Sequence, residues 1–350
     1  MHKRRSILLA LSGVLLLSAG WRSEGKSFSK VDFSGKVAYA LSRANGHSSR
    51  SGWIEVAALG ARAPRAITSK AASPRENDEF PEWSHDGRTV AFVRRSRSPG
   101  ARGVYTISSS GGRAHRIAGV DAKNAGSIYP LRWSPRGGRL VFDRHGAVEC
   151  NTSKPFDLRF EVSRADGHRT RTIHALPKPA TLVQLGDIRW SPSGKKLLYI
   201  VYELDNNGDP TECRFHRPES DLYVVQADGS GRTELIHREV HAAAWSPDGT
   251  QIAYVDCFDA GVAGCDLYVI RVSDRSPRLV QAAQIPPAAD LVWSPRGDEI
   301  LYTGYRGVYA VRLANGTERT VAAWPESDST GALLDFSTAG DFLAVISSYS

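Results

Sequence analysis

The sequence predicts an all-β protein, a six-bladed β-propeller built of four-stranded blades. Three observations predict this fold. A tryptophan-containing turn motif recurs along the chain, short runs with strand character follow each copy, and 32 glycines with 18 prolines provide for frequent turns. Of the 350 residues, 41% are apolar and 23% are charged, which suits a folded chain with a sizeable core.

The N-terminal segment has the features of a secretory signal peptide. Lys3, Arg4 and Arg5 precede an uncharged run over residues 7–17, and small residues follow at 18–20. The run is well short of the roughly 20 residues that span a bilayer. We therefore expect a signal peptide at 1–20, a linker at 21–30 and the propeller at 31–350, in a periplasmic or secreted protein that does not span the membrane. Without the three basic residues the formal charge of +8 falls to about +5, a mildly basic surface.

The repeated motif is an aromatic residue followed by serine and a short turn that contains glycine. Its five clear copies begin at Trp83, Trp133, Trp190, Trp245 and Trp293. Weaker copies begin at Phe33 and Phe336. Serine and aspartate can bond the local backbone, proline presets φ, and glycine supplies the positive φ of a tight hairpin. We expect each tryptophan to be a structural residue buried between blades.

Each repeat carries four short strands, which we call A, B, C and D. Strand A ends in the motif aromatic, and strands such as Gln251 to Val255 (B) and Asp266 to Ile270 (C) follow the turn. Repeats that start at residues 33, 83, 133, 190, 245 and 293 make six blades. The segment 332–347 has the pattern of one more A–B pair, which either joins N-terminal strands in a closing blade or begins a seventh. We predict six blades, with seven as the alternative.

The repeats resemble those of a known family. The run Trp245-Ser-Pro-Asp-Gly, then Ile252-Ala-Tyr, and the run Asp221-Leu-Tyr-Val-Val resemble the WD-like repeats of TolB-type propellers. The resemblance extends from about Phe33 to the C-terminus, and it does not include the N-terminal domain of TolB. It implies an exported propeller, usually of six blades, that binds another molecule.

Motifs of catalysis or metal binding give little support to an enzyme. The chain has no Gly-x-Ser-x-Gly, His-Glu-x-x-His, P-loop or Rossmann motif. His237, Glu239 and His241 alternate along a D–A connection and could hold zinc or manganese. The segment 205–209 resembles the start of a calcium loop, but Pro210 and His216 depart from that pattern. Polar residues are common in such connections, so we predict no catalytic residue, no metal site and no cofactor.

Basic residues form two clusters. Arg94, Arg95, Arg97 and Arg102 fall in one B–C loop, and His168, Arg169 and Arg171 fall in a C–D turn. Propeller geometry places these connections on opposite faces, so we interpret the clusters as solvated loops. An exported protein is also not expected to bind nucleic acid.

The positions three or four residues before each motif aromatic should surround the mouth of the channel, because strand A is innermost. They are Glu79, Phe80, Tyr129, Pro130, Asp187, His241 and Asp290. This acidic and aromatic set favours a cationic or peptide ligand. We predict ligand binding by Glu79, Tyr129, Asp187, His241 and Asp290.

Four cysteines allow three pairings, and an oxidising compartment favours disulfides. Cys257 closes a strand B and Cys265 opens the strand C that follows it, so we predict that these two are bonded. Cys150 and Cys213 lie in the B–C loops of neighbouring blades, and we predict a second disulfide between them.

Together these features predict a monomeric, exported, non-catalytic propeller. We expect it to bind a protein or a cell-envelope ligand through its channel mouth and its B–C and D–A loops, because the repeats account for nearly every residue. The alternative is a propeller enzyme, a lyase or a glycan hydrolase, with a metal or acidic site at the channel. Fold alone does not decide between them.

Overall fold

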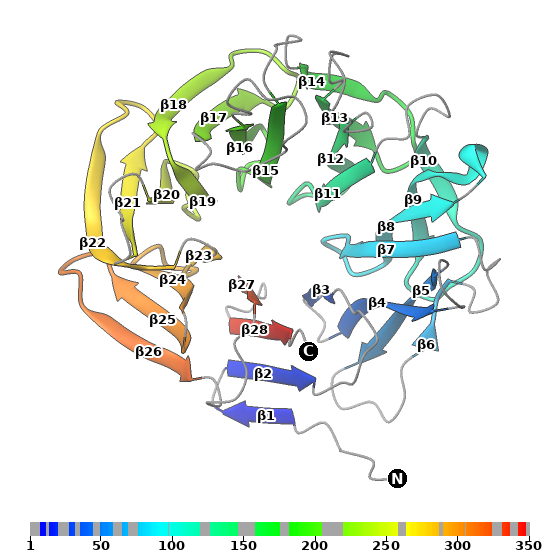
Figure 1. The fold of residues 1–350 in the computed structure, drawn as a ribbon, viewed down its shortest axis with the longest axis horizontal. Coiled ribbons are helices and arrows are strands. Elements are labelled where there is room, and N and C mark those ends of the chain that lie inside the picture. Colours follow the sequence, from blue (N-terminus) through cyan, green and yellow to red (C-terminus); the bar gives the residue numbers. More distant parts are fainter. Residues whose placement is uncertain are drawn as a thin grey trace.

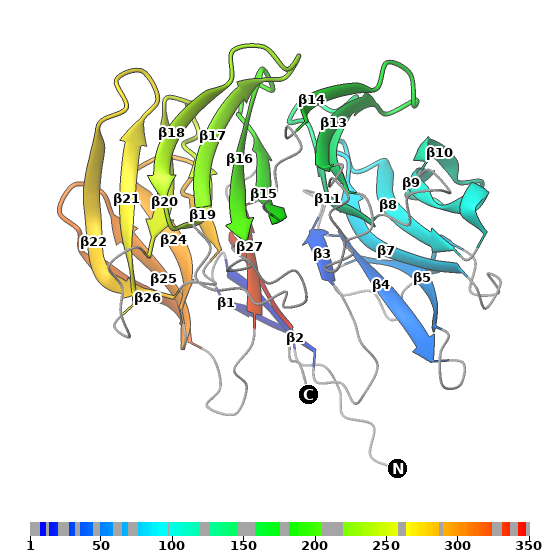
Figure 2. The same cartoon turned by 45° about the horizontal axis from the view of Figure 1, so that its top comes forward.

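The strands are arranged as a ring of sheets (Figure 1). The first strand of each repeat lies near the axis and the last lies outside, and Figure 2 shows the sheets standing side by side around it. The prediction of an all-β chain with four-stranded sheets is confirmed. The computed structural model describes residues 8–11, 14–19, 28–31, 36–44, 50–58, 65–68, 76–96, 98–119, 127–145, 158–175, 182–204, 220–257, 264–286, 290–304, 306–323, 331–336 and 342–347.

Four consecutive repeats each form one antiparallel sheet of four strands in chain order. In each of them strand A ends in the motif tryptophan. The strands are β11 (Ser127–Trp133), β12 (Arg139–His145), β13 (Leu158–Arg164), β14 (Arg171–Ala175), β15 (Leu182–Trp190), β16 (Lys196–Leu204), β17 (Ser220–Gln226), β18 (Thr233–Arg238), β19 (Val240–Trp245), β20 (Gln251–Asp256), β21 (Cys265–Arg271), β22 (Pro277–Ile285), β23 (Leu291–Trp293), β24 (Glu299–Gly304), β25 (Gly307–Arg312) and β26 (Glu318–Ala323).

The two repeats that precede them share one sheet, because a single parallel pairing of Gly52 with Asn77 joins β5 to β7. A short 3-10 helix at Pro99–Ala101 lies between β8 and β9. The strands of this sheet are β3 (Phe28–Val31), β4 (Lys36–Ala44), β5 (Arg50–Ala58), β6 (Arg65–Ala66), β7 (Glu76–Trp83), β8 (Thr89–Ser96), β9 (Gly103–Ser108) and β10 (His115–Gly119).

The remaining sheet brings the two ends of the chain together. β27 (Gly331–Phe336) and β28 (Phe342–Ser347) are antiparallel, β2 (Val14–Ala19) runs parallel to β28, and β1 (Leu8–Leu11) is outermost. The sheet lies between β26 and β3 in the ring (Figure 1). β3 begins inside the predicted linker, and β1 and β2 come from the segment that we interpret as a signal peptide. That interpretation stays a prediction.

The motif turn has the same geometry in all five clear copies. The glycine amide donates to the serine carbonyl at 2.8–2.9 Å, and the glycine φ lies between 64° and 72°. Backbone in that left-handed region favours glycine, as the sequence predicted. In one copy the Ser246 hydroxyl donates to Asp248 at 2.6 Å and accepts the Gln251 amide at 2.9 Å. The turn therefore satisfies its own polar groups.

The motif tryptophans join neighbouring sheets. Each indole N–H donates to the backbone carbonyl of the residue that precedes the motif tryptophan of the previous sheet. That carbonyl belongs to an innermost strand, which in the case of β11, β15 and β19 has a partner strand on one side only, whereas β7 also pairs with β5. The four bonds run from Trp133 to Glu82 (3.0 Å), from Trp190 to Arg132 (3.1 Å), from Trp245 to Arg189 (3.4 Å) and from Trp293 to Ala244 (3.0 Å).

The burial that the sequence predicted for these tryptophans is confirmed for four of the five. Trp83, Trp190, Trp245 and Trp293 are at most 7% exposed, whereas Trp133 is half-buried. The Trp83 indole nitrogen has no partner among the described residues. The residue at the corresponding acceptor position, Asp32, lies outside them.

Stacked aromatic rings join strands B and C at one repeated position. Ring centroids lie 5.4–5.7 Å apart with interplanar angles of 16–23°. Such cross-strand pairs stabilise a sheet beyond the area that they bury. The pairs are Phe92 with Tyr105, Tyr199 with Tyr223, Tyr254 with Tyr268, and Tyr302 with Tyr309.

Replacing Trp293 with phenylalanine tests the bond between sheets. Trp293→Phe keeps an aromatic ring but leaves the Ala244 carbonyl without its donor, so we expect a loss of about 1–3 kcal/mol in the free energy of unfolding. Trp293→Ala also removes the buried ring and should cost about 3–5 kcal/mol. Denaturant unfolding measures both. A phenylalanine variant as stable as the wild type would show that the indole bond does not stabilise the fold.

Candidate functional site

The ring has two structurally different ends. Every A–B turn from β7 to β26 has five residues and every C–D turn has five or six, and we call their end the turn end. Strands A and C begin at the other end, the loop end. There, 12 residues separate β12 from β13, 15 separate β16 from β17, and two separate β24 from β25. Long connections of variable length commonly carry function, so the candidate site lies at the loop end.

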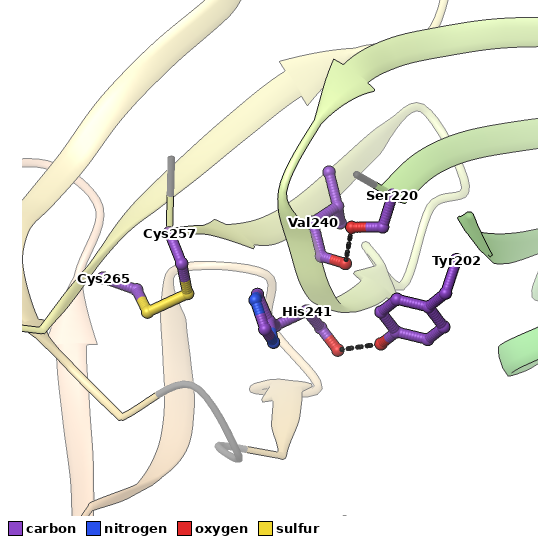
Figure 3. The surroundings of a disulfide bond; sticks show 6 residues. All are labelled: Tyr202, Ser220, Val240, His241, Cys257 and Cys265. Carbon is purple, nitrogen blue, oxygen red and sulfur yellow. Dashed lines mark hydrogen bonds between the residues drawn. A yellow bond between two sulfur atoms is a disulfide. The ribbon is translucent and has the colours of Figure 1, made fainter. Parts of the chain in front are cut away.

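His241 is a predicted site residue that contacts a neighbouring sheet (Figure 3). It lies at the start of β19 and is half-buried. The Tyr202 hydroxyl, from the neighbouring sheet, donates to the His241 carbonyl at 3.2 Å, and the two rings meet edge to face at 6.4 Å. Burial lowers the pKa of His241, and the nearby Asp256 carboxylate partly opposes this effect. The histidine is therefore held as a neutral imidazole next to an aromatic ring.

The disulfide between Cys257 and Cys265 closes the hairpin beside His241 (Figure 3). Both cysteines are buried, and their Cα atoms are 4.4 Å apart. This confirms the first predicted pairing. In the adjoining sheet the Ser220 hydroxyl donates to the Val240 carbonyl at 2.8 Å, which fixes the start of β17 against β19. The second predicted pair, Cys150 with Cys213, lies outside the described residues.

An ion pair connects two sheets that are not neighbours in the ring. Arg189, from β15, bonds the Asp290 carboxylate at 2.5 Å and the Leu291 carbonyl at 3.0 Å, just before and within β23. The sheet that begins with β19 lies between them (Figure 1). Its strand A has the three small residues Ala242, Ala243 and Ala244 beside the tryptophan. A long side chain can pass such small residues, so Arg189 ties β15 to β23.

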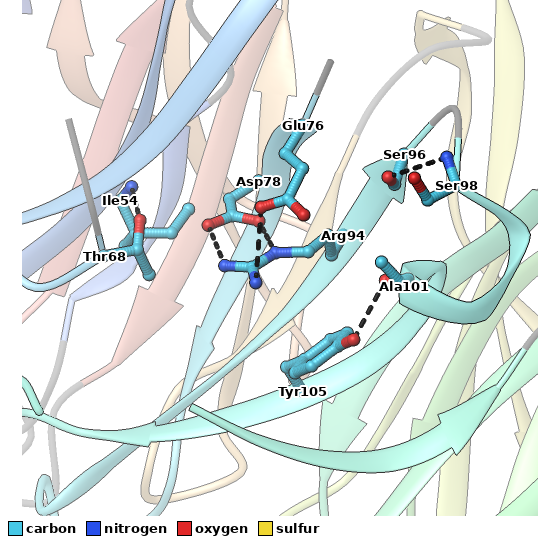
Figure 4. Close-up of polar contacts among 9 residues, drawn as sticks. All are labelled: Ile54, Thr68, Glu76, Asp78, Arg94, Ser96, Ser98, Ala101 and Tyr105. Atoms are coloured by element: carbon cyan, nitrogen blue, oxygen red, sulfur yellow. Dashed lines mark hydrogen bonds and ion pairs between the residues drawn. The ribbon is translucent and has the colours of Figure 1, made fainter. Parts of the chain in front are cut away.

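A second ion pair is buried at the start of β7 (Figure 4). Arg94 holds Asp78 through two bonds of 2.6 and 2.9 Å, lies 3.6 Å from Glu76, and stacks on the Tyr105 ring at 4.9 Å. Asp78 raises the pKa of Arg94. The guanidinium therefore belongs to an internal network.

The neighbouring basic residues are also engaged. Arg95 pairs with Glu79 at 2.7 Å, and Arg102 donates to the Ser96 carbonyl at 2.5 Å. Glu79 also accepts a bond from the Asn77 amide. The basic cluster that we interpreted as solvated loops thus consists, in its described members, of paired side chains, because strand A of the same repeat supplies carboxylates opposite it. Arg97 lies outside the described residues.

The other predicted site positions are placed less fully. Tyr129 pairs with Asp143 across β11 and β12, and Asp187 lies within β15, but the structure does not describe either side chain. The same holds for Pro130. Phe80 has a φ of 53°, in the left-handed region, at a bulge where β7 shifts register against β8. Glu79, Asp290 and His241 each contact a different side chain, Arg95, Arg189 and Tyr202 respectively.

Asp143 is a buried carboxyl that was not predicted from the sequence. It lies in β12 and is 1% exposed. Burial raises its pKa well above the ordinary value, while Arg132 opposes that shift. The feature of the sequence that could have indicated its burial is that Asp143 directly follows the apolar run Leu140 to Phe142. Arg189, between Ile188 and Trp190, carried a similar signal.

The metal-like pattern of the D–A connection consists of His237, Glu239 and His241, and these three side chains are not grouped around one point. His237 bonds Asp221 at 2.6 Å through Nδ1, Glu239 accepts the Cys257 amide through its carbonyl at 3.0 Å, and His241 faces Tyr202. Across the described residues, no three or more His, Cys, Asp or Glu side chains are grouped so that they could hold a metal ion. The calcium-like segment 205–209 lies outside those residues.

Comparison with solved structures identifies the fold. An oligogalacturonate lyase in complex with manganese is 13% identical, and the match covers 87% of this chain and 80% of that chain with a TM-score of 0.61. The oligogalacturonate lyase from Vibrio parahaemolyticus is 14% identical, over 90% and 86%, with a TM-score of 0.63. The β-propeller domain of the Trilobed protease from Pyrococcus furiosus is 15% identical, over 91% and 94%, with a TM-score of 0.57.

The chain is a β-propeller. The predicted resemblance to TolB-like propellers is confirmed for the fold. TolB from Acinetobacter baumannii itself is 15% identical, over 90% of this chain and 67% of that chain, with a TM-score of 0.47. No family model and no curated protein matches the sequence. In the part of the propeller that the structure describes, no helix has the length and apolar character of a membrane span.

A double-mutant cycle tests the tie between β15 and β23. We expect Arg189→Met and Asp290→Asn each to destabilise the propeller. Either substitution alone removes the half-buried charged hydrogen bond, so the double variant does not lose it a second time, and we expect a coupling energy of about 1–2 kcal/mol. Unfolding of the four proteins in denaturant measures it. Additive effects would show that the two side chains do not interact in solution.

His241 should make the stability of the propeller depend on pH. Its pKa is lower in the folded chain than the ordinary 6.5, so the unfolded chain takes up the proton first as the pH falls. Stability is then lost as the pH falls below about 6.5. We expect His241→Gln to lose less stability than the wild type between about pH 7.5 and 5. Denaturant unfolding at the two pH values measures this. If the wild type and His241→Gln lose the same stability between these values, the shifted pKa is contradicted.

Proposed function

We propose that this propeller is an exported, non-catalytic protein that binds a protein or a cell-envelope ligand at its loop end. The observation that carries the proposal is the difference between the two ends. Connections at the turn end are short and uniform, whereas those at the loop end range from two to 15 residues between strands B and C. A rigid ring that presents variable loops at one end is a common arrangement for recognition.

The chemistry at the channel mouth supports a ligand with both donors and acceptors, such as a peptide. Glu79 and Asp290 face Arg95 and Arg189, so a ligand meets ion pairs there and not bare carboxylates. His241 offers an imidazole held neutral beside the Tyr202 ring. We therefore propose that the loop end binds through Glu79, Tyr129, Asp187, His241 and Asp290.

The proposal includes the state and the architecture of the exported chain. We propose a periplasmic or secreted monomer that does not bind nucleic acid, from which residues 1–20 have been removed. For the ring we propose six blades, with seven as the alternative. β27 and β28 pair with β2 and β1, but β1 and β2 lie within residues 1–20, so this pairing does not support a seventh blade in the processed chain.

A catalytic function is the second candidate. The match to two oligogalacturonate lyases, over 80% and 86% of their lengths, supports considering a lyase or a glycan hydrolase. Such an enzyme would use a metal or acidic groups at the channel. Asp143 in β12, whose buried carboxyl has a raised pKa, is the described residue that we would assign to proton transfer in that case.

Capture from envelope extract tests the binding function. The full chain without residues 1–20 is immobilised beside His241→Ala, and beside Ser193→Ala as a control in an exposed motif turn at the turn end. We expect the wild type and the control to retain one partner, and His241→Ala to retain at least tenfold less of it. Retention that is equal on all three, or absent, would contradict binding at the loop end.

A second measurement separates the two candidates. The same preparation is analysed for bound metals and incubated with oligogalacturonate, with and without added manganese, while shortened chains are followed. No turnover is expected. Turnover that Asp143→Asn abolishes would replace the binding proposal with the enzyme.

A further inference from the structure

The turn end of the ring carries an uneven distribution of charge. The ten A–B and C–D turns from β7 to β26, together with the strand residues that flank them, hold fourteen lysines and arginines and eight aspartates and glutamates. Eight of the fourteen basic residues and only two of the eight acidic residues belong to the two sheets β11–β14 and β15–β18. The excess positive charge of this end is therefore concentrated on two neighbouring sheets.

Six of these eight basic side chains are exposed, and we call them the basic turn patch. They are Arg136, Arg164, Arg169, Arg171, Lys195 and Arg232. From the sequence only Arg169 and Arg171 of this set were expected to lie together, in a single turn. Arg164 flanks that same turn, and the ring brings it together with Arg136, Lys195 and Arg232, which come from other turns.

The turns that carry the patch form one continuous surface. Within each sheet a backbone bond joins the A–B turn to the C–D turn, and an arginine joins the first sheet to the second. The three bonds run from the Ala165 amide to Gly138 (2.9 Å), from the Ala227 amide to Lys195 (2.8 Å) and from Arg139 to the Gly194 carbonyl (2.5 Å). The positions of the charges are thus fixed relative to one another.

The two carboxylates within the patch are already used by their own turns. Asp166 accepts the His168 amide at 2.9 Å and pairs with Arg164, and Asp228 accepts the Ser230 amide at 2.9 Å. Both have pKa values below the ordinary value because of these bonds. They remain ionised, yet two negative charges do not balance six exposed positive ones.

Arg169 adds a conformational observation. Its φ is 57°, in the left-handed region that is unfavourable for a residue with a long side chain. The corresponding residues of three other C–D turns, Gly231, Arg275 and Gly316, have the same conformation, so it belongs to the turn type. Here it presents a guanidinium at the tip of an exposed turn.

We propose that the basic turn patch docks the propeller on an anionic membrane surface. Arginine predominates in the patch, and its planar guanidinium matches the oxygens of a phosphate group. Short, tightly bonded turns present these charges together, which suits an extended anionic surface. Each basic residue raises the affinity of such a cluster for an anionic lipid surface by about fivefold. The loop end then points away from the membrane, toward its ligand.

This inference concerns the end of the ring opposite the proposed binding site and does not depend on that function. Exposed clusters of single-sign charge are a known means of association with anionic lipid. The loop-end cluster of Arg94, Arg95 and Arg102 does not compete with the patch, because its described members are paired with carboxylates or a carbonyl.

Vesicle binding with matched variants tests the proposal. The full chain without residues 1–20 is sedimented with vesicles of phosphatidylcholine alone and of phosphatidylcholine with phosphatidylglycerol. The patch variant is Arg136→Gln with Arg169→Asn. The control is Arg296→Gln with Arg275→Asn, which removes the same charges from the same turn positions outside the patch. Arg296 follows the same Ser-Pro pair as Arg136, and Arg275 has a φ of 56°.

We expect binding only to the vesicles that contain phosphatidylglycerol, weakened by salt, and reduced about 20-fold in the patch variant but less than about threefold in the control. Circular dichroism and thermal unfolding confirm that both variants are folded. Equal loss in the two variants would show a net-charge effect and overturn the patch. Binding to heparin or polygalacturonate without binding to vesicles would replace the membrane with a soluble polyanion.

Discussion

The innermost strands β11, β15 and β19 have no partner strand on their channel side, and the motif tryptophan of the next sheet compensates for this. Its ring fills the space between sheets, and its N–H donates to a carbonyl of that unpaired edge, as Trp293 does to Ala244 at 3.0 Å. Buried carbonyls without a donor are costly. The side chain therefore contributes apolar burial and a hydrogen bond together, and the same solution recurs along the ring. The Arg189 guanidinium likewise donates a hydrogen bond to the Leu291 carbonyl of β23.

This constraint makes the two ends of the ring unequal. The motif turn follows the tryptophan directly, so its length and conformation are tied to the seam between sheets, and all five copies have five residues with nearly the same glycine φ. The connections at the loop end carry no such restriction. Their length varies, and the polar groups near them, such as His241 with Tyr202 and Glu79 with Arg95, differ from repeat to repeat. This difference is why we propose the loop end as the recognition surface, while the turn end is regular.

Charge is organised in opposite ways at these ends. Arg94 is held by Asp78 and Arg189 is held by Asp290, so both ion pairs remove net charge near the start of a strand A. Buried or half-buried carboxylates are stabilised by such pairing. At the turn end of β11–β18 the arginines outnumber the carboxylates, and the two aspartates there bond their own turns. The described charged groups near the starts of strands A are thus largely paired, whereas the turn end of β11–β18 presents unbalanced positive charge.

The sequence by itself determined the repeat, the four strands of each unit, the turn chemistry, the burial of four of the five motif tryptophans and the disulfide between Cys257 and Cys265. All of these depend on residues close together in the chain, where periodicity and turn preferences act directly. Only the tertiary structure decided that Arg94 faces Asp78, that Arg189 reaches Asp290 past three alanines, that the Asp143 carboxyl is buried, and that arginines of separate turns form one patch. These side chains lie 16 to 101 residues from their partners, or gain their environment from a neighbouring sheet. Their pairing is fixed by closure of the ring, which brings together residues whose local sequence contains no sign of one another.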